Sequence, residues 1–339
     1  MLTYALMGIL VLWLALSSLW GIKFDSNKNS FMSIEDTVFL RGFWCIIVVL
    51  VHVPADYHNR IQDMLGSFAY IGVTFFFMTS AYGLKWSIDH KVGYMDGFWR
   101  RRLPPILVPA LIASAFNVAA KGINGDPISV LSFLNINNWI KVLLLYYVVF
   151  WVIYGLLPRK LNMGGMQDFI MCLVVLALSL IDYFTKFKIT MIWVVEPLGF
   201  AYGILAAKWS DSIRKWMSRQ WLIKCISLGI SAGILGIAYL KFKPVFFWGE
   251  YMLKLVLGIA ITLFMYEVLS KLKVGNRVNA FLGSISYEVY ILNVAVFKML
   301  MSFGVQWNSG QMIITALVVT VLLAWILKQV SGLILKRIR

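Results

Sequence analysis

The hydrophobic positions of this 339-residue chain form long continuous runs, separated by short polar connections. The runs reach about 17 to 24 residues, the length of a helix that spans a bilayer. Continuous runs argue against a β-barrel, whose strands alternate between apolar and polar positions. The pattern predicts an all-α polytopic membrane protein with about eleven spans, at residues 2–22, 38–55, 66–86, 104–120, 139–157, 168–184, 190–207, 222–240, 250–268, 281–303 and 312–334.

Composition agrees with a chain embedded in lipid. Hydrophobic residues make up 61% of it and charged residues only 14%, too little charge to cover the surface of a soluble domain of this size. The net charge of +16 would suggest a nucleic-acid partner in a soluble protein. Here the basic residues stand in the short connections, so we read them as topology signals and expect the lipid bilayer, with no nucleic acid, as the partner.

Basic residues gather in alternate connections. One set holds Lys23, Lys28, Lys91, Arg100, Arg101, Arg102, Arg159, Lys160, Lys208, Arg214, Lys215, Arg219, Lys271, Lys273 and Arg277, with Lys336, Arg337 and Arg339 in the C-terminal tail. The other set holds Arg60, Lys121, Lys186, Lys188, Lys241 and Lys243. The richer side is cytoplasmic by the positive-inside rule. The prediction is therefore an N-terminus outside and a C-terminus inside, which agrees with an odd number of spans.

The first apolar run and the cysteines each exclude one interpretation. No lysine or arginine precedes Lys23, so we expect residues 2–22 to be a retained membrane helix and not a cleaved signal peptide. Cys45, Cys172 and Cys225 are far apart, and the three histidines form no HxxH or HExxH pattern. Neither a disulfide framework nor a metal site is predicted.

An arginine and a histidine bracket the apolar segment "LRGFWCIIVVLVH". Arg41 and His52 are eleven residues apart, which on a helix means about 16 Å along the axis and about 20° around it. Both side chains therefore point to one face, which we expect to line the bundle interior or a water-filled cavity. Alternatively, Arg41 extends to the inner headgroups and His52 sits at the outer interface. Histidine suits proton transfer near neutral pH.

Two further groups of polar residues are candidates. Glu196, in "MIWVVEPLGFAYG", is a carboxylate inside a predicted span, and is either functional or the ion-pair partner of a nearby lysine or arginine. The stretch "FWRRRLPP" places Arg100, Arg101 and Arg102 at the cytoplasmic foot of a span. Guanidinium groups bind phosphate in a bidentate manner, which fits a ligand such as coenzyme A. The alternative is a cluster that contacts lipid headgroups.

These segments, in this order, resemble the acyltransferase-3 family of integral membrane acyltransferases. Similar motifs are "LRG" with the later histidine, "FFFMTSAYG", "RRLPP", "NNWIKVLLLYYVVFW", "PLG" and "LGSISYEVYILN". The resemblance runs from about Asp36 to the last span. It implies a ten-helix membrane domain over residues 36–339, with residues 1–22 as an additional helix.

Three positions depart from the family pattern. Ala81 replaces a glycine, and Pro105 stands where an arginine is often found. Asn293 replaces a histidine near the end of the late motif, and an asparagine cannot carry a proton near pH 7. Any acid–base work at that position is lost, which leaves it to His52.

The resemblance implies transfer of an acetyl group from cytoplasmic acetyl-CoA to a hydroxyl of a cell-surface polysaccharide or its lipid-linked precursor. The protein would then be an O-acetyltransferase of the bacterial cell membrane. It implies His52 as general base or transient acyl carrier, with Arg41 helping to hold the donor or to orient the pore. Arg100–Arg102 would contact the CoA phosphates, and Glu196 would orient His52.

Two alternatives stay open. A proton-coupled transporter or flippase of an envelope precursor would use His52 and Glu196 as a proton relay. Against it, no inverted repeat or pair of broken half-helices is visible in the sequence. A catalytically lapsed relative is the other alternative, motivated by Pro105 and Asn293.

Overall fold

The computed structural model describes residues 1–338 except 124, 126, 130–132, 134, 135, 158–164 and 186–193. Its elements in chain order are α1 (Leu2–Leu19), β1 (Lys23–Phe24), α2 (Ile34–Val51), η1 (Ala55–Tyr57), α3 (Arg60–Gly66), α4 (Ala69–His90), α5 (Phe98–Arg102), α6 (Pro104–Ile123), α8 (Asn138–Trp151), η2 (Val152–Leu156), α9 (Met166–Phe184), η3 (Glu196–Leu198), α10 (Gly199–Lys208), α11 (Ser210–Met217), α12 (Trp221–Phe242), η4 (Trp248–Leu253), α13 (Lys254–Leu269), β2 (Leu272–Lys273), α14 (Arg277–Ser284), α15 (Ser286–Ser302) and α16 (Ser309–Ile338).

The prediction of an all-α polytopic membrane protein is confirmed. Among the described residues, eight helices are long and apolar enough to cross a membrane, and the bent pair α14–α15 makes a ninth if it counts as one span. Outside those nine, the predicted span 38–55 falls on α2, which carries Glu35, Asp36 and Arg41. The predicted span 190–207 is described only from residue 194, and it contains η3 and all of α10 except its last residue. The count of eleven and the orientation stay predictions.

One predicted span is not a single straight helix. Residues 281–303 were expected to be continuous, but α14 and α15 meet at an angle of 70° around Ile285. The hydroxyls of Ser284 and Ser286 donate to the carbonyls of Phe281 and Gly283, three residues earlier. Such local bonds compete with the helical hydrogen-bond ladder and favour a bend.

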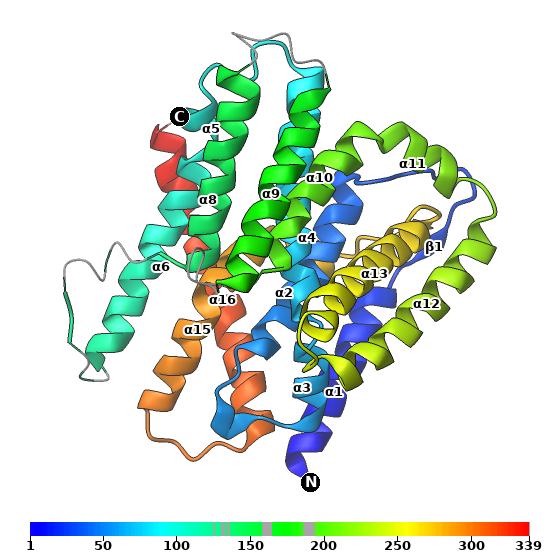
Figure 1. Ribbon diagram of the computed structural model, residues 1–339. Helices are drawn as coiled ribbons and strands as arrows, with labels where there is room; N and C mark the ends of the chain where they lie inside the picture. Colours follow the sequence, from blue (N-terminus) through cyan, green and yellow to red (C-terminus); the bar gives the residue numbers. More distant parts are fainter. Residues whose placement is uncertain are drawn as a thin grey trace.

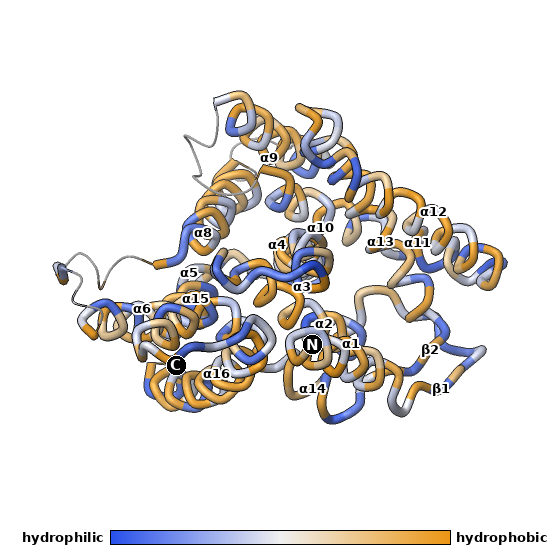
Figure 2. The backbone as a smooth tube through the Cα atoms, turned by 90° about the horizontal axis from the view of Figure 1, so that it is seen from below, coloured by the Kyte–Doolittle hydropathy of each residue, from blue (hydrophilic) through white to orange (hydrophobic). Residues whose placement is uncertain are grey.

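Helix α4 forms the axis of the bundle. Viewed along that axis, α4 lies at the centre, close to α2, α3 and α10, and the other long helices surround it (Figure 2). Helix α10 approaches α4 through Gly199 and Gly203, where an added Cβ would overlap the carbonyl oxygens of Thr74 and Met78. The glycine of the "PLG" motif is therefore required for this close contact. At 22 residues, α4 is about 33 Å long and spans the molecule.

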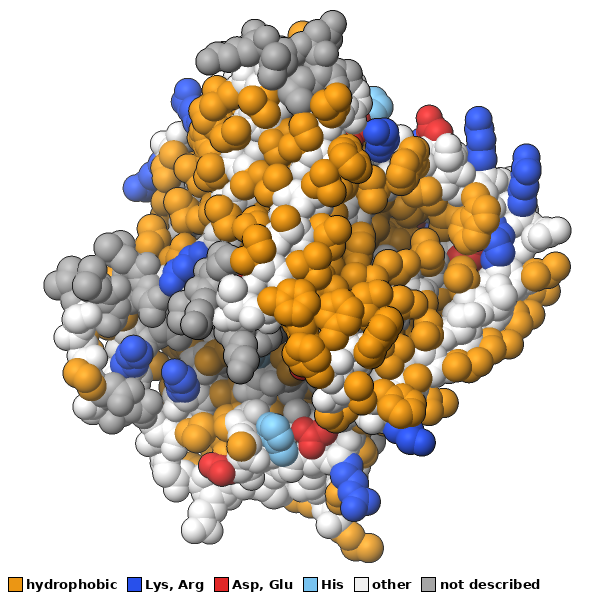
Figure 3. All heavy atoms as spheres, in the orientation of Figure 1, with side chains coloured by type: hydrophobic (Ala, Val, Ile, Leu, Met, Phe, Trp, Pro, Cys, Tyr) orange, Lys and Arg blue, Asp and Glu red, His pale blue; other side chains and the backbone are white. Residues whose placement is uncertain are grey.

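The two ends of the molecule differ. The N-terminus lies at one end, while the C-terminus and α5 lie at the other (Figure 1). Between the ends, apolar side chains cover most of the visible face, and lysines and arginines stand mainly towards its margins (Figure 3). On α12 the exposed apolar side chains include Leu222, Ile223, Ile226, Ile230, Ile234 and Ile237. A wide apolar surface of this kind is expected of a protein embedded in lipid. Of the basic residues used to orient the chain, Arg159, Lys160, Lys186, Lys188 and Arg339 lie outside the described residues.

Candidate active site

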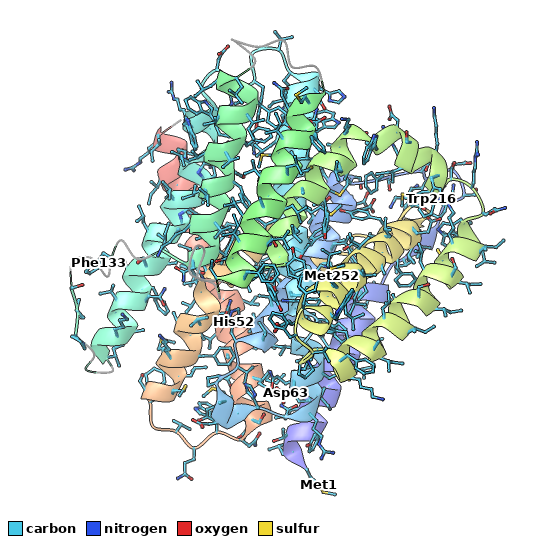
Figure 4. All side chains as sticks on the ribbon, viewed as in Figure 1. Met1, His52, Asp63, Phe133, Trp216 and Met252 are labelled. Carbon is cyan, nitrogen blue, oxygen red and sulfur yellow. The ribbon has the colours of Figure 1, made fainter. Side chains whose placement is uncertain are left out.

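A cavity of about 430 Å³ opens beside the end of α2, and we call it the His52 cavity. Figure 4 places His52 and Asp63 in the half of the bundle that holds the N-terminus. Helices α2, α3, α4 and α12 contribute to the wall, together with the first residues of η3 and α13. The lining residues are Val51, His52, His58, Gln62, Asp63, Gly66, Ser67, Ala69, Tyr70, Val73, Glu196, Tyr239, Lys243 and Lys254.

His52 is held in one tautomer. It is the C-terminal cap of α2, and its Nδ1 lies 2.9 Å from the carbonyl oxygen of Val48. Because a carbonyl oxygen can only accept, Nδ1 carries the hydrogen. In the neutral imidazole, Nε2 then has a free lone pair, and it has no hydrogen-bond partner within the described part of the chain. His52 therefore presents a proton acceptor at the wall of its cavity.

Glu196 reaches the same cavity but pairs with a lysine. Its side chain is only 1% exposed, and its Oε1 accepts a hydrogen bond of 2.6 Å from Nζ of Lys254. The ammonium group also lies 4.9 Å from the centre of the Tyr70 ring. The second carboxylate oxygen, Oε2, is buried without a partner among the described residues. No hydrogen bond joins Glu196 to His52 in the described structure, so the expected orienting contact is replaced by one to the backbone of Val48.

Sequence reasoning missed Lys254, although a signal for it existed. Lys254 lies within the predicted span 250–268, where any charged side chain is a functional candidate. It follows directly on η4, a π-helical turn, and such turns are frequent at functional sites. Tyr70 was missed as well, because nothing in its local sequence separates it from a packing residue.

Arg41 points into the protein interior. Its Nη2 donates a hydrogen bond of 2.9 Å to Oγ1 of Thr79 on α4, and its guanidinium carbon lies 5.5 Å from the centre of the Phe76 ring. Its Nε is buried without a partner among the described residues. The Arg41 side chain therefore does not extend to the inner headgroups. Next to Thr79, the Ser80 hydroxyl lies 2.6 Å from that of Tyr147.

The three arginines line a second cavity of about 680 Å³, which we call the arginine cavity. Its wall is made of Ser87, Lys91, Val92, Gly93, Tyr94, Arg100, Arg101, Arg102, Pro104, Pro105 and Ile338. Arg101 donates to the carbonyl oxygen of Tyr94, and Nε of Arg102 donates to the Tyr94 hydroxyl at 2.8 Å. Pro105 thus stands in the wall beside the arginines that precede it.

Helix α4 connects the two cavities. Ala69, Tyr70 and Val73 at its start line the His52 cavity, and Ser87 near its end lines the arginine cavity. Ser87 follows Tyr70 by seventeen positions, which correspond to about 26 Å along the helix axis. Thr79, the partner of Arg41, lies midway. Arg41 bonds Thr79 of α4, and His52 lines a cavity whose wall includes the start of the same helix.

Asn293 and the three cysteines line neither the His52 cavity nor the arginine cavity. Asn293 is fully buried on α15, and its Nδ2 donates to the carbonyl oxygens of Val289 and Tyr290. Cys45, Cys172 and Cys225 are free thiols. Among the described residues, no group of three or more His, Cys, Asp or Glu side chains could hold a metal ion.

A comparison of the whole sequence with family models and known proteins gives one result. The acyltransferase-domain model of the acyltransferase-3 family matches residues 38–329. The chain therefore belongs to that family, and it is a multi-pass membrane acyltransferase. Neither the curated proteins nor the solved structures contain a significant match.

Proposed function

We propose that this protein is an O-acetyltransferase. It takes an acetyl group from acetyl-CoA, whose nucleotide end binds in the arginine cavity. It delivers the acetyl group to a hydroxyl of a cell-surface polysaccharide, or of its lipid-linked precursor, at the His52 cavity. One observation carries the proposal: a histidine with a free Nε2 and a cluster of three arginines line cavities at opposite ends of the same central helix.

The arginine cavity has the chemistry that a polyphosphate needs. Arg100, Arg101, Arg102 and Lys91 put four cationic side chains around one space. Bidentate, charge-assisted hydrogen bonds from guanidinium groups are the strong contacts that phosphates make with proteins. The contacts to Tyr94 fix Arg101 and Arg102 in place before the ligand arrives. The acyl thioester, at the far end of the flexible CoA arm, extends along α4 past Arg41.

His52 acts as the general base in this proposal. Its Nε2 takes the proton of the acceptor hydroxyl while the hydroxyl oxygen attacks the thioester carbonyl carbon. A carbon–oxygen bond forms, the carbon–sulfur bond breaks, and the CoA sulfur leaves with the proton that the imidazole received. The hydrogen bond to Val48 places the hydrogen of the neutral ring on Nδ1, so Nε2 is the nitrogen that accepts the proton. Transient attachment of the acetyl group to the same nitrogen is the alternative route.

Arg41 supports the donor in this scheme. Its guanidinium sits inside the protein, held by Thr79 and covered by Phe76. A buried cation is costly unless its hydrogen-bonding groups are paired, and Nε of Arg41 has no partner among the described residues. An unpaired cation inside a membrane protein is therefore a candidate for a functional role. We assign the hydrogen-bonding capacity of Nε to the carbonyl groups of the CoA arm. Arg41 thus positions the thioester relative to His52.

The test is ester-linked acetate on the envelope polysaccharide of the host, released by mild alkali. A gene deletion is complemented with wild type, with His52→Ala or with His90→Ala. His90 is a matched control because its Nδ1 also bonds the carbonyl four residues earlier, that of Trp86, but it does not line the His52 cavity. Wild type and His90→Ala should restore the acetate and His52→Ala should not. Acetate that the deletion leaves unchanged would favour transport of an envelope precursor instead.

A further inference from the structure

Two residues in the wall of the His52 cavity each have a buried polar atom without a hydrogen-bond partner among the described residues. The two atoms are Oε2 of Glu196 and the hydroxyl of Tyr70. Both residues are buried, and both line the cavity. Lys254 connects them, because its Nζ binds Oε1 of Glu196 and lies over the Tyr70 ring.

An unpaired carboxylate oxygen in a buried site is costly. When an ion pair is buried, the free energy gained from its attraction barely offsets the free energy lost with its hydration. Each polar atom that is left without a hydrogen bond adds a further cost. Glu196 and Tyr70 differ from the other buried residues with unpaired polar atoms because they line the His52 cavity, where a ligand can complete the bonding. A carboxylate oxygen can only accept a hydrogen bond, whereas a phenol can donate one or accept one. The two atoms together therefore match a ligand with neighbouring hydroxyl groups.

We propose that Glu196, Lys254 and Tyr70 form the subsite that binds a hydroxyl-rich acceptor, in a role that rests on the proposed O-acetyltransferase function. Oε2 of Glu196 accepts a hydrogen bond from one acceptor hydroxyl, and the Tyr70 hydroxyl bonds a second oxygen. Lys254 is a positioning residue that holds the carboxylate in place. Tyr239, whose ring centre is 5.5 Å from that of Tyr70, adds an apolar wall for the carbon face of a sugar ring.

The experiment measures acetyl transfer by the full-length protein in lipid nanodiscs. Radiolabelled acetyl-CoA is the donor, and host polysaccharide stripped of its esters by mild alkali is the acceptor. For Glu196→Gln we expect KM for the polysaccharide to rise about tenfold or more, because a charge-assisted hydrogen bond is lost. KM for acetyl-CoA should stay unchanged. Tyr70→Phe should give a smaller rise, because only a neutral hydrogen bond is removed.

A second buried pair provides the matched control. Glu267 is fully buried, and its Oε1 lies 3.2 Å from Nζ of Lys224, but neither residue lines the His52 cavity. Glu267→Gln removes the same chemistry elsewhere in the protein and should leave KM for the polysaccharide unchanged. An equal rise in both variants would show that general loss of structure is the cause, and would overturn the proposal.

The charge-reversed variant Glu196→Lys/Lys254→Glu separates binding from folding. It keeps an ion pair between the two positions but moves the carboxylate, so the protein should be retained in the membrane while KM for the polysaccharide stays high. Recovery of the wild-type KM would mean that the pair is only structural. If wild type itself transfers no acetate to the polysaccharide, the proposed function fails. If wild type is active and Glu196→Gln binds the polysaccharide normally, this subsite alone fails.

Discussion

The His52 cavity and the arginine cavity meet their ligands in different ways. The wall of the first contains the buried Glu196 and Tyr70, with atoms fixed by packing and with unsatisfied hydrogen-bonding capacity. The wall of the second contains the exposed Arg100 and Arg101, and Arg101 and Arg102 satisfy part of their capacity on Tyr94. Buried atoms with unused hydrogen-bonding capacity at one end suit chemistry and selection of the acceptor, while exposed charge at the other end suits capture of an anion. Substitutions should therefore have larger effects at the His52 end.

We expect the two cavities to open on opposite sides of the membrane, and cysteine labelling gives an all-or-none test of this orientation. In a variant with Cys45, Cys172 and Cys225 replaced by alanine, Arg60→Cys should react with an impermeant maleimide in intact cells. Arg101→Cys should react only after the membrane is permeabilised, because the positive-inside rule places it in the cytoplasm. The reverse pattern of labelling would invert the orientation and place donor binding outside.

The largest kinetic effect should come from His52. His52→Ala removes the base, so kcat for acetyl transfer should fall by roughly 10²- to 10⁴-fold, the usual contribution of a general base. KM for acetyl-CoA should change little, because the imidazole does not contact the nucleotide in our proposal. The measurement is steady-state transfer in nanodiscs, with His90→Ala as the control. A fall in the two variants by the same factor would remove His52 from the chemistry.

Substitutions at Arg41 and Thr79 test whether the region between the two cavities holds the thioester. Arg41→Met keeps much of the side-chain length and removes the cation, and we expect at least a tenfold loss of kcat because the thioester is no longer held. Thr79→Val keeps the guanidinium and removes the hydroxyl that accepts its hydrogen bond and itself donates to the carbonyl oxygen of Phe76. It should cost about 1 kcal/mol, close to fivefold in rate. Equal losses in the two variants would show that Arg41 acts only through Thr79.

Some features of the fold and of the site could be predicted from the sequence, because they depend on local patterns along the chain. Continuous apolar runs are costly outside lipid or a helix bundle, and every predicted span overlaps described helical residues, although 190–207 is described only from residue 194. The shared face of Arg41 and His52 follows from helix geometry alone, and both lie beside α4. A single straight helix over 281–303 was wrong because serine hydroxyls compete locally with the backbone ladder.

The pairing of Glu196 could not be predicted in the same way. Its partner, Lys254, is 58 residues further along the chain and on another helix. Apolar periodicity determines which residues are helical, but not which helices are neighbours or how they are rotated. The proposed contact between Glu196 and His52 was inferred from residue types alone. In the structure the backbone of Val48 takes up Nδ1 of His52, and the lysine takes up Oε1 of the carboxylate.

The smallest effects should come from the arginine cavity. Arg100→Gln, Arg101→Gln and Arg102→Gln should each raise KM for acetyl-CoA by only a few-fold, because a partly exposed charge is screened and its neighbours compensate. The triple variant should show a larger rise, while kcat at saturating donor should stay near wild type. Raising the salt concentration should increase KM in wild type and have less effect in the triple variant.

Position 102 sharpens this last prediction. Arg102 bonds the Tyr94 hydroxyl through Nε at 2.8 Å, whereas Arg100 has no hydrogen bond within the described structure. Arg100→Lys keeps the charge and should behave like wild type. Arg102→Lys also keeps the charge but loses the planar group that Tyr94 holds in place, so it should raise KM for acetyl-CoA as much as Arg102→Gln. If both lysine variants bind the donor normally, charge alone captures it, and the arrangement around Tyr94 contributes nothing to binding.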